Sequence, residues 1–346
     1  MTDYKSFDKY KWYGVSGKDS DIVVSTRVRI ARNLKDYPFS PRLVDVGARE
    51  IIEKVRAVPE MKELQYTDFA EQSPVLAHSL AERHIVSPEF AGMKTPHGLL
   101  SDPEKGLYIM LCEEDHLRLQ CLMSGESLDA AYKTVMDAEA ALDRTLDFAY
   151  SERFGYLTHC PTNLGTGMRA SVMMFLPAIS AAREIASLQS QLSKLGLTVR
   201  GMSGEGSAAD GCLYQISNQI TLGVSEDETL KKLAGVVKSI AERERELRGS
   251  INGEEFLRLR DRVRRAVGIM RYAELMDTRE LFDIYAKVRL GAAMGMTDSI
   301  TCEMMDALLF ESMPAAITAE AGEAVKTPTD RDAVRAAKAR AVSGIV

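Results

Sequence analysis

Apolar and polar positions alternate near the start of the chain. Between residues 22 and 30, Ile, Val, Thr, Val and Ile occupy every second position, and Ser25, Arg27 and Arg29 lie between them. Successive side chains of a β-strand point to opposite faces. The pattern therefore predicts a strand over residues 22–30 that buries one face and projects two arginines side by side from the other.

Two further apolar stretches predict strands next to charged residues. Residues 107–112 are Leu-Tyr-Ile-Met-Leu-Cys and lead directly into Glu-Glu-Asp-His-Leu-Arg at 113–118. If the chain stays extended there, Glu114 and Arg118 share a face. The other stretch, Ala-Ser-Val-Met-Met-Phe-Leu, follows Arg169. Together these strands predict a sheet whose polar face collects charge.

Helical periodicity fills much of the remaining chain. Residues 127–150 have it, and Ser225 with Glu228 forms a capping-box pattern that opens a further helix. The charged tract that follows ends near Gly249, where we expect a domain boundary. Beyond it the sequence has helical spacing and little strand signal, so we predict one unit over 1–248 and a helical domain over 249–346.

Composition restricts the class of protein. The chain has 346 residues, 45% of them hydrophobic, and a net charge of -6. Its longest nearly apolar stretch, 170–182, is shorter than the roughly 18 residues of a membrane span. The first residues lack a signal-peptide pattern, and the five cysteines are scattered without a Cys-x-x-Cys pair. We expect a cytoplasmic protein with reduced thiols that binds neither membrane nor nucleic acid.

Two glycine-bearing loops carry candidate binding groups. Cys160-Pro-Thr-Asn-Leu-Gly-Thr-Gly-Met-Arg169 ends in a cation, and Arg200-Gly-Met-Ser-Gly-Glu205 joins a cation to a carboxylate. Glycines let backbone N–H groups approach an anion, and arginine offers paired donors to phosphate. Taken alone, the first loop is more often a plain tight turn and the second a mobile surface loop. Neither matches a Walker or dinucleotide motif.

The acidic run after residue 112 indicates either a polar cleft or a solvated strand end. Four titratable groups that follow a buried strand are costly to place unless they face polar surroundings. His116 by itself is more often a structural hydrogen-bonding histidine than a catalyst. No second ligand at metal spacing accompanies it, so we predict no metal site.

Four motifs in order give this chain a specific resemblance. Ser-Thr-Arg-Val-Arg at 25–29, Glu-Glu-Asp-His-Leu-Arg, the Cys-Pro-Thr-Asn-Leu-Gly-Thr-Gly-Met-Arg loop and Arg-Gly-x-x-Gly-Glu occur as in phosphagen (guanidino) kinases. The resemblance covers roughly residues 20–245. It implies an α/β (α+β) catalytic domain with a largely antiparallel sheet flanked by helices, which binds ATP with Mg²⁺.

The resemblance also implies roles for individual residues. Glu114 corresponds to the carboxylate that orients and deprotonates the guanidinium, Glu205 to a second carboxylate on a closing loop, and Cys160 to the reactive cysteine beside the guanidino group. His84 is a weaker match to the histidine beside the adenine. The positions that match the ATP-binding residues around the phosphates are Ser25, Arg27, Arg29, Arg118, Arg169 and Arg200. One departure is Cys112, where the family usually has Asn, which puts the local hydrogen bonding in doubt.

The acceptor is expected to be an arginine on a protein. Only some two dozen residues precede the first motif, whereas kinases of free guanidino metabolites carry a helical domain there that encloses the small substrate. The helical C-terminal domain is similar to that of bacterial protein arginine kinases, and Arg331-Asp332-Ala-Val-Arg335-Ala336 matches their phosphoarginine-binding motif. Arginines would take the phosphate and aspartate the guanidinium, although an ordinary charged helix face has the same pattern.

Partners follow from the same resemblance. It implies arginine-containing protein substrates, among them a transcriptional repressor and the Clp protease machinery, with a role in marking proteins for degradation under stress. It also allows an activator protein and a homodimer. Two alternatives stay open: a kinase for a free guanidino metabolite such as arginine, and a non-catalytic phosphoarginine-binding regulator.

Overall fold

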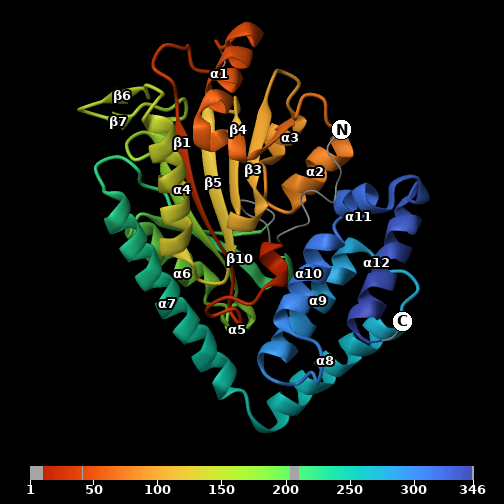
Figure 1. Ribbon diagram of the computed structural model, residues 1–346. Helices are drawn as coiled ribbons and strands as arrows, with labels where there is room; N and C mark the ends of the chain where they lie inside the picture. The colour runs from red at the N-terminus through yellow and green to blue at the C-terminus, as the bar shows by residue number, and fades with distance from the viewer. Residues whose placement is uncertain (1–10, 41, 203–209, 345–346) are drawn as a thin grey trace.

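An antiparallel sheet organises the protein (Figure 1). The structure is a computed structural model that describes residues 11–40, 42–202 and 210–344. The eight strands of the main sheet lie in the order β2-β3-β4-β5-β1-β8-β10-β9, and every described pair is antiparallel, as predicted. The strands are β1 (Val23–Arg32), β2 (Gln65–Asp68), β3 (Gly98–Asp102), β4 (Leu107–Leu111), β5 (Leu117–Ser124), β8 (Met168–Phe175), β9 (Leu197–Gly201) and β10 (Leu213–Asn218), with a separate hairpin of β6 (Tyr150–Ser151) and β7 (Gly155–Tyr156).

Helices cover one face of this sheet along its length. Ile51 of α1, Val135 of α4 and Leu233 of α7 belong to one hydrophobic cluster with the strand residues Ile109 and Leu119. Figure 1 shows these helices beside the strands. The helices that precede residue 251 are α1 (Asp45–Ala57), α2 (Pro74–Glu82), α3 (Pro88–Gly92), α4 (Leu128–Asp143), α5 (Pro177–Ala181), α6 (Ile185–Lys194) and α7 (Glu226–Ser250).

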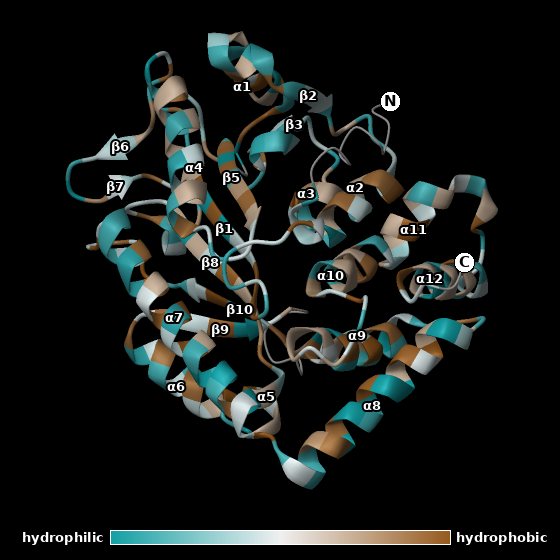
Figure 2. Cartoon of the chain, turned by 60° about the horizontal axis from the view of Figure 1, so that its bottom comes forward, coloured by the Kyte–Doolittle hydropathy of each residue, from teal (hydrophilic) through white to brown (hydrophobic). Residues whose placement is uncertain are grey.

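The C-terminal part of the chain is helical, as its spacing predicted. Its helices are α8 (Gly253–Tyr272), α9 (Thr278–Ala293), α10 (Cys302–Glu311), α11 (Pro314–Ala321) and α12 (Pro328–Val342). Along α8, hydrophobic and hydrophilic residues intermingle (Figure 2). Of the helices in the described ranges, none is long and apolar enough to cross a membrane.

The helical region packs against the rest of the protein through a second hydrophobic cluster. This cluster joins Leu309 and Phe310 of α10 to Trp12, to Leu80 of α2 and to Tyr108 of β4. The chain turns between α7 and α8 at residues 251–252, close to the predicted boundary. The division of the chain near Gly249 into two domains stays a prediction, because shared packing of this kind is compatible with one folding unit or two.

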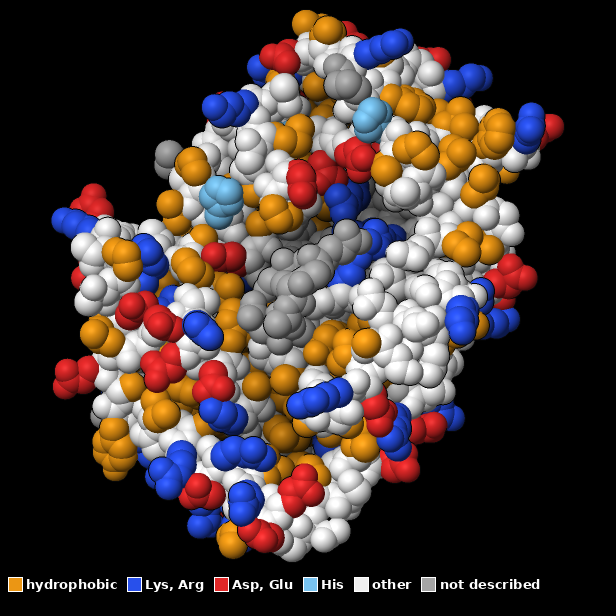
Figure 3. Space-filling view, turned by 180° about the vertical axis from the view of Figure 1, so that it is seen from behind, with side chains coloured by type: hydrophobic (Ala, Val, Ile, Leu, Met, Phe, Trp, Pro, Cys, Tyr) orange, Lys and Arg blue, Asp and Glu red, His pale blue; other side chains and the backbone are white. Residues whose placement is uncertain are grey.

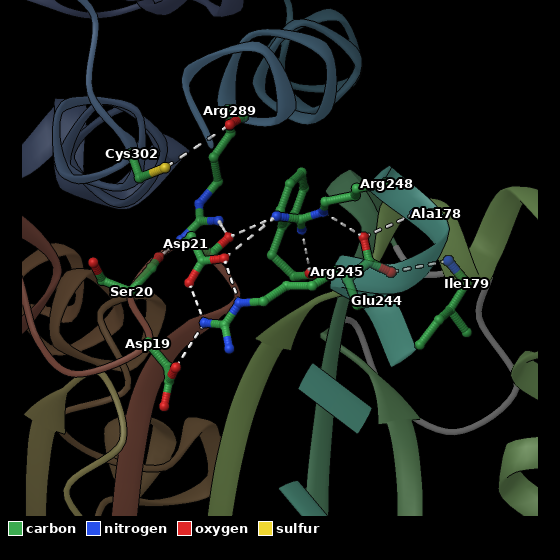
Figure 4. Close-up of polar contacts among 11 residues, drawn as sticks. Asp19, Ser20, Asp21, Ala178, Ile179, Glu244, Arg245, Arg248, Arg289 and Cys302 are labelled. Atoms are coloured by element: carbon green, nitrogen blue, oxygen red, sulfur yellow. Dashed lines mark hydrogen bonds and ion pairs between the residues drawn. The ribbon is translucent and has the colours of Figure 1, made fainter. Parts of the chain in front are cut away.

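A partly buried ionic junction ties the segment before β1 to α9 and α7 (Figure 4). Arg289 of α9 donates to Asp306 at 2.7 Å and to the carbonyl oxygens of Ser20 and Asp21 at 2.9 and 3.1 Å. Arg245 of α7 binds the Asp21 carboxylate at 2.6 Å. The helical region therefore anchors the entry into β1 through backbone as well as side-chain groups.

The predicted strand at 22–30 exists, with one wrong position. Val28 and Ile30 are buried in the first cluster, and Arg27 and Arg29 occupy the opposite face, as predicted. Val24 was expected beside Val28 but belongs to the second cluster. The reason is an irregularity in the pairing of β1 with β8 between Val23 and Ser25, which shifts the alternation by one residue.

The expected extension of the chain from residue 107 through 118 is wrong. The chain reverses between β4 and β5, and these strands pair antiparallel with Leu111 opposite Leu117. Cys112 has a left-handed φ of 61°, and its N–H donates to the carbonyl of His116 at 2.8 Å. This conformation closes a hairpin and places the acidic run at its tip rather than along a strand.

The predicted helix starts are accurate, but one predicted end is not. The capping box of Ser225 and Glu228 is present at the start of α7. The helix predicted over 127–150 ends at Asp143, and the residues after it form a turn and then β6. Apolar residues in that turn, such as Phe148, pack into the first cluster and mimic helical spacing.

Candidate active site

Five arginines lie on one face of the sheet. Arg29 pairs directly with Arg169 across β1 and β8, and Arg118 pairs with Ala31 on the neighbouring strand. Directly paired residues share a face, and so do residues two apart on one strand. Counting through Gln215 of β10 places Arg200 of β9 on that same face. The arginines are Arg27, Arg29, Arg118, Arg169 and Arg200.

Carboxylates and a cysteine join three of these arginines around a cavity of about 140 Å³. Its wall is formed by Arg29, Arg118 and Arg169 together with Glu114 and Cys160. On the face opposite to that of Figure 1, acidic and basic side chains meet in a hollow (Figure 3). Residues from three of the four motifs are thus brought to one place.

Arg27 and Arg29 are buried among like charges on this face. Burial, followed by the like charges of neighbouring arginines, lowers the pKa of Arg29 well below its ordinary value. The same causes lower the pKa of Arg27 to about 9, so its guanidinium still carries its charge at neutral pH. The buried Nε of Arg29 has no hydrogen-bond partner among the described residues. A polyanion such as a nucleotide triphosphate fits this face because it supplies both the missing charge and the missing acceptors.

Glu113, which the sequence did not single out, holds Arg118. Its carboxylate accepts from Arg118 Nη1 at 2.6 Å and from the Ser87 hydroxyl, and only 6% of the residue is exposed. The carboxylate that pairs with Arg118 is therefore that of Glu113. The Glu114 carboxylate is left at the mouth of the cavity, where reduced hydration, then the charges of Asp115 and Glu113, raises its pKa.

The rest of the acidic run fixes the hairpin. Asp115 accepts from Asn33 Nδ2 and from the backbone N–H of His159, both at 2.7 Å. His116 accepts at Nδ1 from the N–H of Leu34 (3.0 Å) and its Nε2 lies 3.1 Å from the carbonyl of Pro38. Nε2 therefore carries the proton. The interpretation of His116 as a structural histidine is confirmed, because both ring nitrogens are used by the backbone.

The loop that carries Cys160 is fixed by glycine geometry. Gly165 and Gly167 have φ of 109° and 64°, and an added Cβ would lie 2.3 Å from Thr221 O and 2.7 Å from Ala31 O, respectively. The loop therefore needs glycine for close backbone packing. Cys160 Sγ lies 3.0 Å from the Thr162 hydroxyl, at the wall of the cavity.

A narrow cleft on the same face is lined by three more of the residues predicted to bind the nucleotide. Ser25, Arg27 and His84 line it with Gln215 and Ser171. Burial, then the charges of Arg27 and Arg29, lowers the pKa of His84 to about 3, which leaves the imidazole neutral. A neutral ring can stack on a purine beside the triphosphate-binding arginines.

The other predicted residues lie elsewhere. Arg200 shares the arginine face but lines neither the cavity nor the cleft. Glu205 lies outside the described residues. Within the described ranges, no group of three or more His, Cys, Asp or Glu side chains is placed to hold a metal ion.

The predicted phosphoarginine motif lies on α12. Arg335 is buried, at 1% exposure, and donates to the carbonyl oxygens of Ser312 (2.9 Å) and Met276 (2.7 Å) and to Asp332 (2.7 Å). Ala336 is fully buried. In this conformation Arg335 holds helices together and does not present its guanidinium as predicted, whereas Arg331 and Asp332 remain partly exposed.

Cys112, which stands where the family usually has Asn, lies in a turn outside the cavity. Its left-handed φ is a conformation that asparagine tolerates better than other residues with a Cβ. The Cys112 side chain is buried and its thiol donates to Ala48 O at 3.6 Å, away from the cavity. The residue at this position therefore belongs to the turn and not to the wall of the cavity.

Sequence reasoning missed the residues that support the site. Glu113 was visible as a neighbour of Glu114, but no local signal separates the residue that pairs with an arginine from the one that faces the cavity. Asn33 donates to Asp115 and accepts from the N–H of His116, some eighty residues away. Such partners depend on the order of the strands in the sheet, which cannot be deduced from a single sequence.

Comparison with known proteins agrees with this geometry. Residues 48–247 match the family model "ATP:guanido phosphotransferase, C-terminal catalytic domain", and residues 257–343 match "Protein-arginine kinase McsB C-terminal domain". The crystal structure of a lombricine kinase has the same fold, with a TM-score of 0.58 and 24% identity over 70% of this chain and 71% of that one.

Sequence relatives span nearly the full chain. The protein-arginine kinase of Moorella thermoacetica is 39% identical over 338 residues, covering 95% of this chain and 96% of the relative. That of Pelotomaculum thermopropionicum is 38% identical over 332 residues, covering 94% and 93%. With both parts of the chain matched and the arginine face and Glu114 in place, the chain belongs to the protein-arginine kinase family of guanidino phosphotransferases.

Proposed function

We propose that the protein transfers the γ-phosphoryl group of ATP to the guanidinium of arginine residues in proteins. The observation that carries this proposal is the cavity in which Glu114 faces Arg29, Arg118 and Arg169. Arginines stabilise the negative charge that spreads over the phosphoryl oxygens during transfer. A carboxylate is what a guanidinium acceptor needs, both to hold it and to take its proton.

The reaction balances with residues of this chain. A guanidinium nitrogen attacks the γ-phosphorus, the bond from that phosphorus to the β,γ-bridging oxygen breaks, and ADP leaves with the electron pair. The proton released by the nitrogen goes to the Glu114 carboxylate, whose raised pKa improves it as a base. Cys160, at the cavity wall, positions the guanidino group and forms no covalent intermediate. Glu205 is the proposed second carboxylate.

The nucleotide is held by the sheet. Arg27, Arg29, Arg169 and Arg200 bind the phosphates with Arg118, while Ser25 and His84 line the cleft for the nucleoside. Mg²⁺ belongs to the same proposal and supplies further charge neutralisation. Mg²⁺ keeps several waters and usually reaches kinase sites through substrate phosphates, so a dedicated protein cage is not required.

The acceptor and partners are proposals that rest on the relatives. The curated relatives are named protein-arginine kinases, which supports a protein-borne arginine over a free metabolite. A transcriptional repressor and the Clp protease machinery as targets, a role in protein degradation under stress, an activator protein and a cytoplasmic location remain part of the proposal. A homodimer is supported by exposed apolar side chains on α8 and the turn after it: Leu257, Ile269, Tyr272 and Leu275.

We also propose that α12 receives phosphoarginine as a regulatory ligand. Arg331 and Asp332 are partly exposed neighbours on the helix, suited to a phosphate and a guanidinium respectively. Arg335 supports them through its contact with Asp332. The assignment of residues 249–346 as a separate domain for binding and dimerisation belongs to this proposal.

The test is a phosphorylation assay with Mg²⁺ and ATP on two acceptors, free arginine and an arginine-rich protein. Acid-labile phosphate should appear on the protein acceptor, and Glu114→Gln should lower the rate at least about 100-fold while ATP still binds. Glu89→Gln, at an exposed position on α3, is the matched control and should leave the rate unchanged.

Each failure has its own meaning. Phosphate on free arginine alone would replace the proposal by a metabolite kinase. No transfer with intact phosphoarginine binding would favour the non-catalytic regulator. Wild-type turnover in Glu114→Gln would remove Glu114 as the base.

A further inference from the structure

His84 contacts two aromatic residues that come from opposite ends of the chain. Its ring lies 5.8 Å from that of Phe310 on α10, at 72°, and 6.3 Å from that of Trp12. Phe310 and Trp12 contact each other at 4.6 Å between centroids, and both are almost fully buried. The wall of the nucleoside cleft is therefore backed by the C-terminal helical region.

The backbone at His84 is held in a conformation that it would not keep alone. Its φ is 59°, which is uncommon for a residue with a side chain. Trp12 Nε1 donates to Arg83 O at 3.0 Å, and Gln120 Nε2 donates to His84 O at 2.9 Å. The direction of the imidazole thus depends on Trp12 from one side and on β5 from the other.

The helix that ends just before His84 is also fastened to the helical region. The Glu82 carboxylate accepts from the N–H groups of Ala315 and Ala316, at 3.0 and 2.8 Å. These are the first free N–H groups of α11, where a carboxylate is favoured by the helix dipole. A movement of α10 or α11 would therefore move Phe310 and the end of α2 together.

We propose that Phe310 is a positioning residue of the nucleotide site, which fixes His84 for the adenine and so sets the affinity for ATP from the helical region. The proposal rests on the proposed function, since it assigns the base-binding role to His84. Phe310 does not line the nucleoside cleft itself, so it acts through the ring of His84 and the backbone around it. The phosphate end of the site is held separately, by arginines of the sheet.

Because the two ends are held by different elements, the proposal predicts a selective effect. Phe310→Leu removes the ring but keeps an apolar side chain, so the helical region stays packed while His84 loses its edge-to-face partner. Aromatic pairs of this kind correspond to roughly 3- to 10-fold in an equilibrium constant. We expect the KM for ATP to rise by about that factor, with kcat changed less than about 2-fold.

The decisive measurement is calorimetric binding of two ligands to the full-length protein. ATP carries the base, whereas inorganic triphosphate carries only the phosphates. Phe310→Leu should weaken ATP and leave inorganic triphosphate unchanged. Val263→Ala, a buried truncation on α8 in the same hydrophobic cluster, is the control for general loosening and should leave both unchanged. Phe310→Tyr keeps the ring and should restore ATP affinity.

A second measurement needs no variant. Trp12 is the only tryptophan of the chain, so its emission should change when ATP or adenosine fills the cleft beside His84. The proposal would be overturned if Phe310→Leu bound ATP with unchanged affinity, or if it lost affinity for inorganic triphosphate to the same extent. It would also be overturned if saturating ATP left the Trp12 emission unchanged. Failure of the wild-type protein to bind ATP would instead overturn the proposed function, so the two failures are distinguishable.

Discussion

Two groups of arginines lie against the same sheet and differ in what surrounds them. In the candidate active site, Arg29 sits among other arginines, and its buried Nε has no partner among the described residues. In the ionic junction, Arg289 binds Asp306 at 2.7 Å. Arg248 binds Glu244 at 2.7 Å (Figure 4), and both arginines also donate to backbone carbonyls.

The pKa shifts of Arg29 and Arg289 have opposite signs, although burial lowers the pKa of Arg248 in the junction as well. Burial and like charges lower the pKa of Arg29, whereas for Arg289 burial is outweighed by Asp306 and Tyr285, which raise its pKa. A buried cation that is fully matched holds the fold together. A group of cations that is not matched costs stability, and persists where a ligand supplies the anion. A carboxylate bound to the guanidinium, and not the sign of the pKa shift, therefore marks Arg289 and Arg248 as structural arginines.

The largest expected effect is in the junction. Arg289→Met should lower the free energy of unfolding by about 3–5 kcal/mol, because it leaves Asp306 as a buried, unpaired charge and removes the donor to the Ser20 carbonyl. Urea unfolding measures it. Arg243→Met, which breaks a solvent-exposed pair with Glu184, should lower the free energy of unfolding far less. Equal costs would end the distinction between the two kinds of arginine.

The active-site group should respond in the opposite way. Arg29→Met removes a donor to phosphate and should weaken ATP binding by about 10- to 100-fold. The free energy of unfolding should stay the same or rise, because a source of like-charge repulsion is gone. Calorimetry with ATP and urea unfolding of the same protein test both halves. Arg49→Met, at an exposed position on α1, is the control. A large loss of stability in Arg29→Met would place that arginine with the structural group.

The sequence predicts the active-site group of arginines but not the structural group. The alternation around Arg27 and Arg29 predicts a strand with both arginines on one face, and the pairing of β1 with β8 adds Arg169 to it. Arg289 and Arg248 gave no such signal, because a cation on an amphipathic helix looks the same whether it meets water or a carboxylate from a distant segment.

Two wrong expectations have the same physical origin. The chain reverses at Cys112 because of one left-handed residue, which hydrophobic patterning does not detect. Arg335 was expected to face a ligand, but it binds carbonyls of Ser312 and Met276, which lie in other turns of the helical region. Patterning gives the element on which a residue lies, while the partner depends on tertiary contacts.

A smaller effect would show how strongly the arginine group acts on its neighbours. The pKa of His84 is lowered to about 3 in the folded protein. Below about pH 6.5 the histidine is therefore protonated in the unfolded chain but stays neutral in the folded chain, which favours unfolding. Above that pH the titration of His84 does not reduce the free energy of unfolding, and the reduction grows as the pH falls toward 3. Because His84 is only partly buried, we expect about 1 kcal/mol of loss between pH 6.5 and 5.

The variant His84→Asn isolates this loss, because asparagine tolerates the left-handed backbone and does not titrate. Urea unfolding at both pH values should show a weaker pH dependence in His84→Asn than in the wild type. His78→Asn, at an exposed position on α2, should behave as the wild type. The same pH dependence in all three proteins would mean that neither burial nor the neighbouring arginines depress the pKa of His84.

The smallest effect concerns the hairpin that delivers Glu113 and Glu114 to the arginine face. Cys112 adopts φ 61°, a conformation that costs a residue with a Cβ about 1 kcal/mol and costs asparagine less. Cys112→Asn should therefore raise the free energy of unfolding by about 0.5 kcal/mol, since its amide can also donate to Ala48 O, as the thiol does. The rate of phosphoryl transfer should not change, because the Cys112 side chain lies outside the cavity and Glu113 is held by Arg118.

Cys112→Ala keeps the strained backbone and loses the thiol, so it should be the least stable of the three proteins. If alanine proves more stable than asparagine, the backbone conformation is not what favours asparagine at this position, and a faster or slower transfer rate in Cys112→Asn would tie the residue to the site after all.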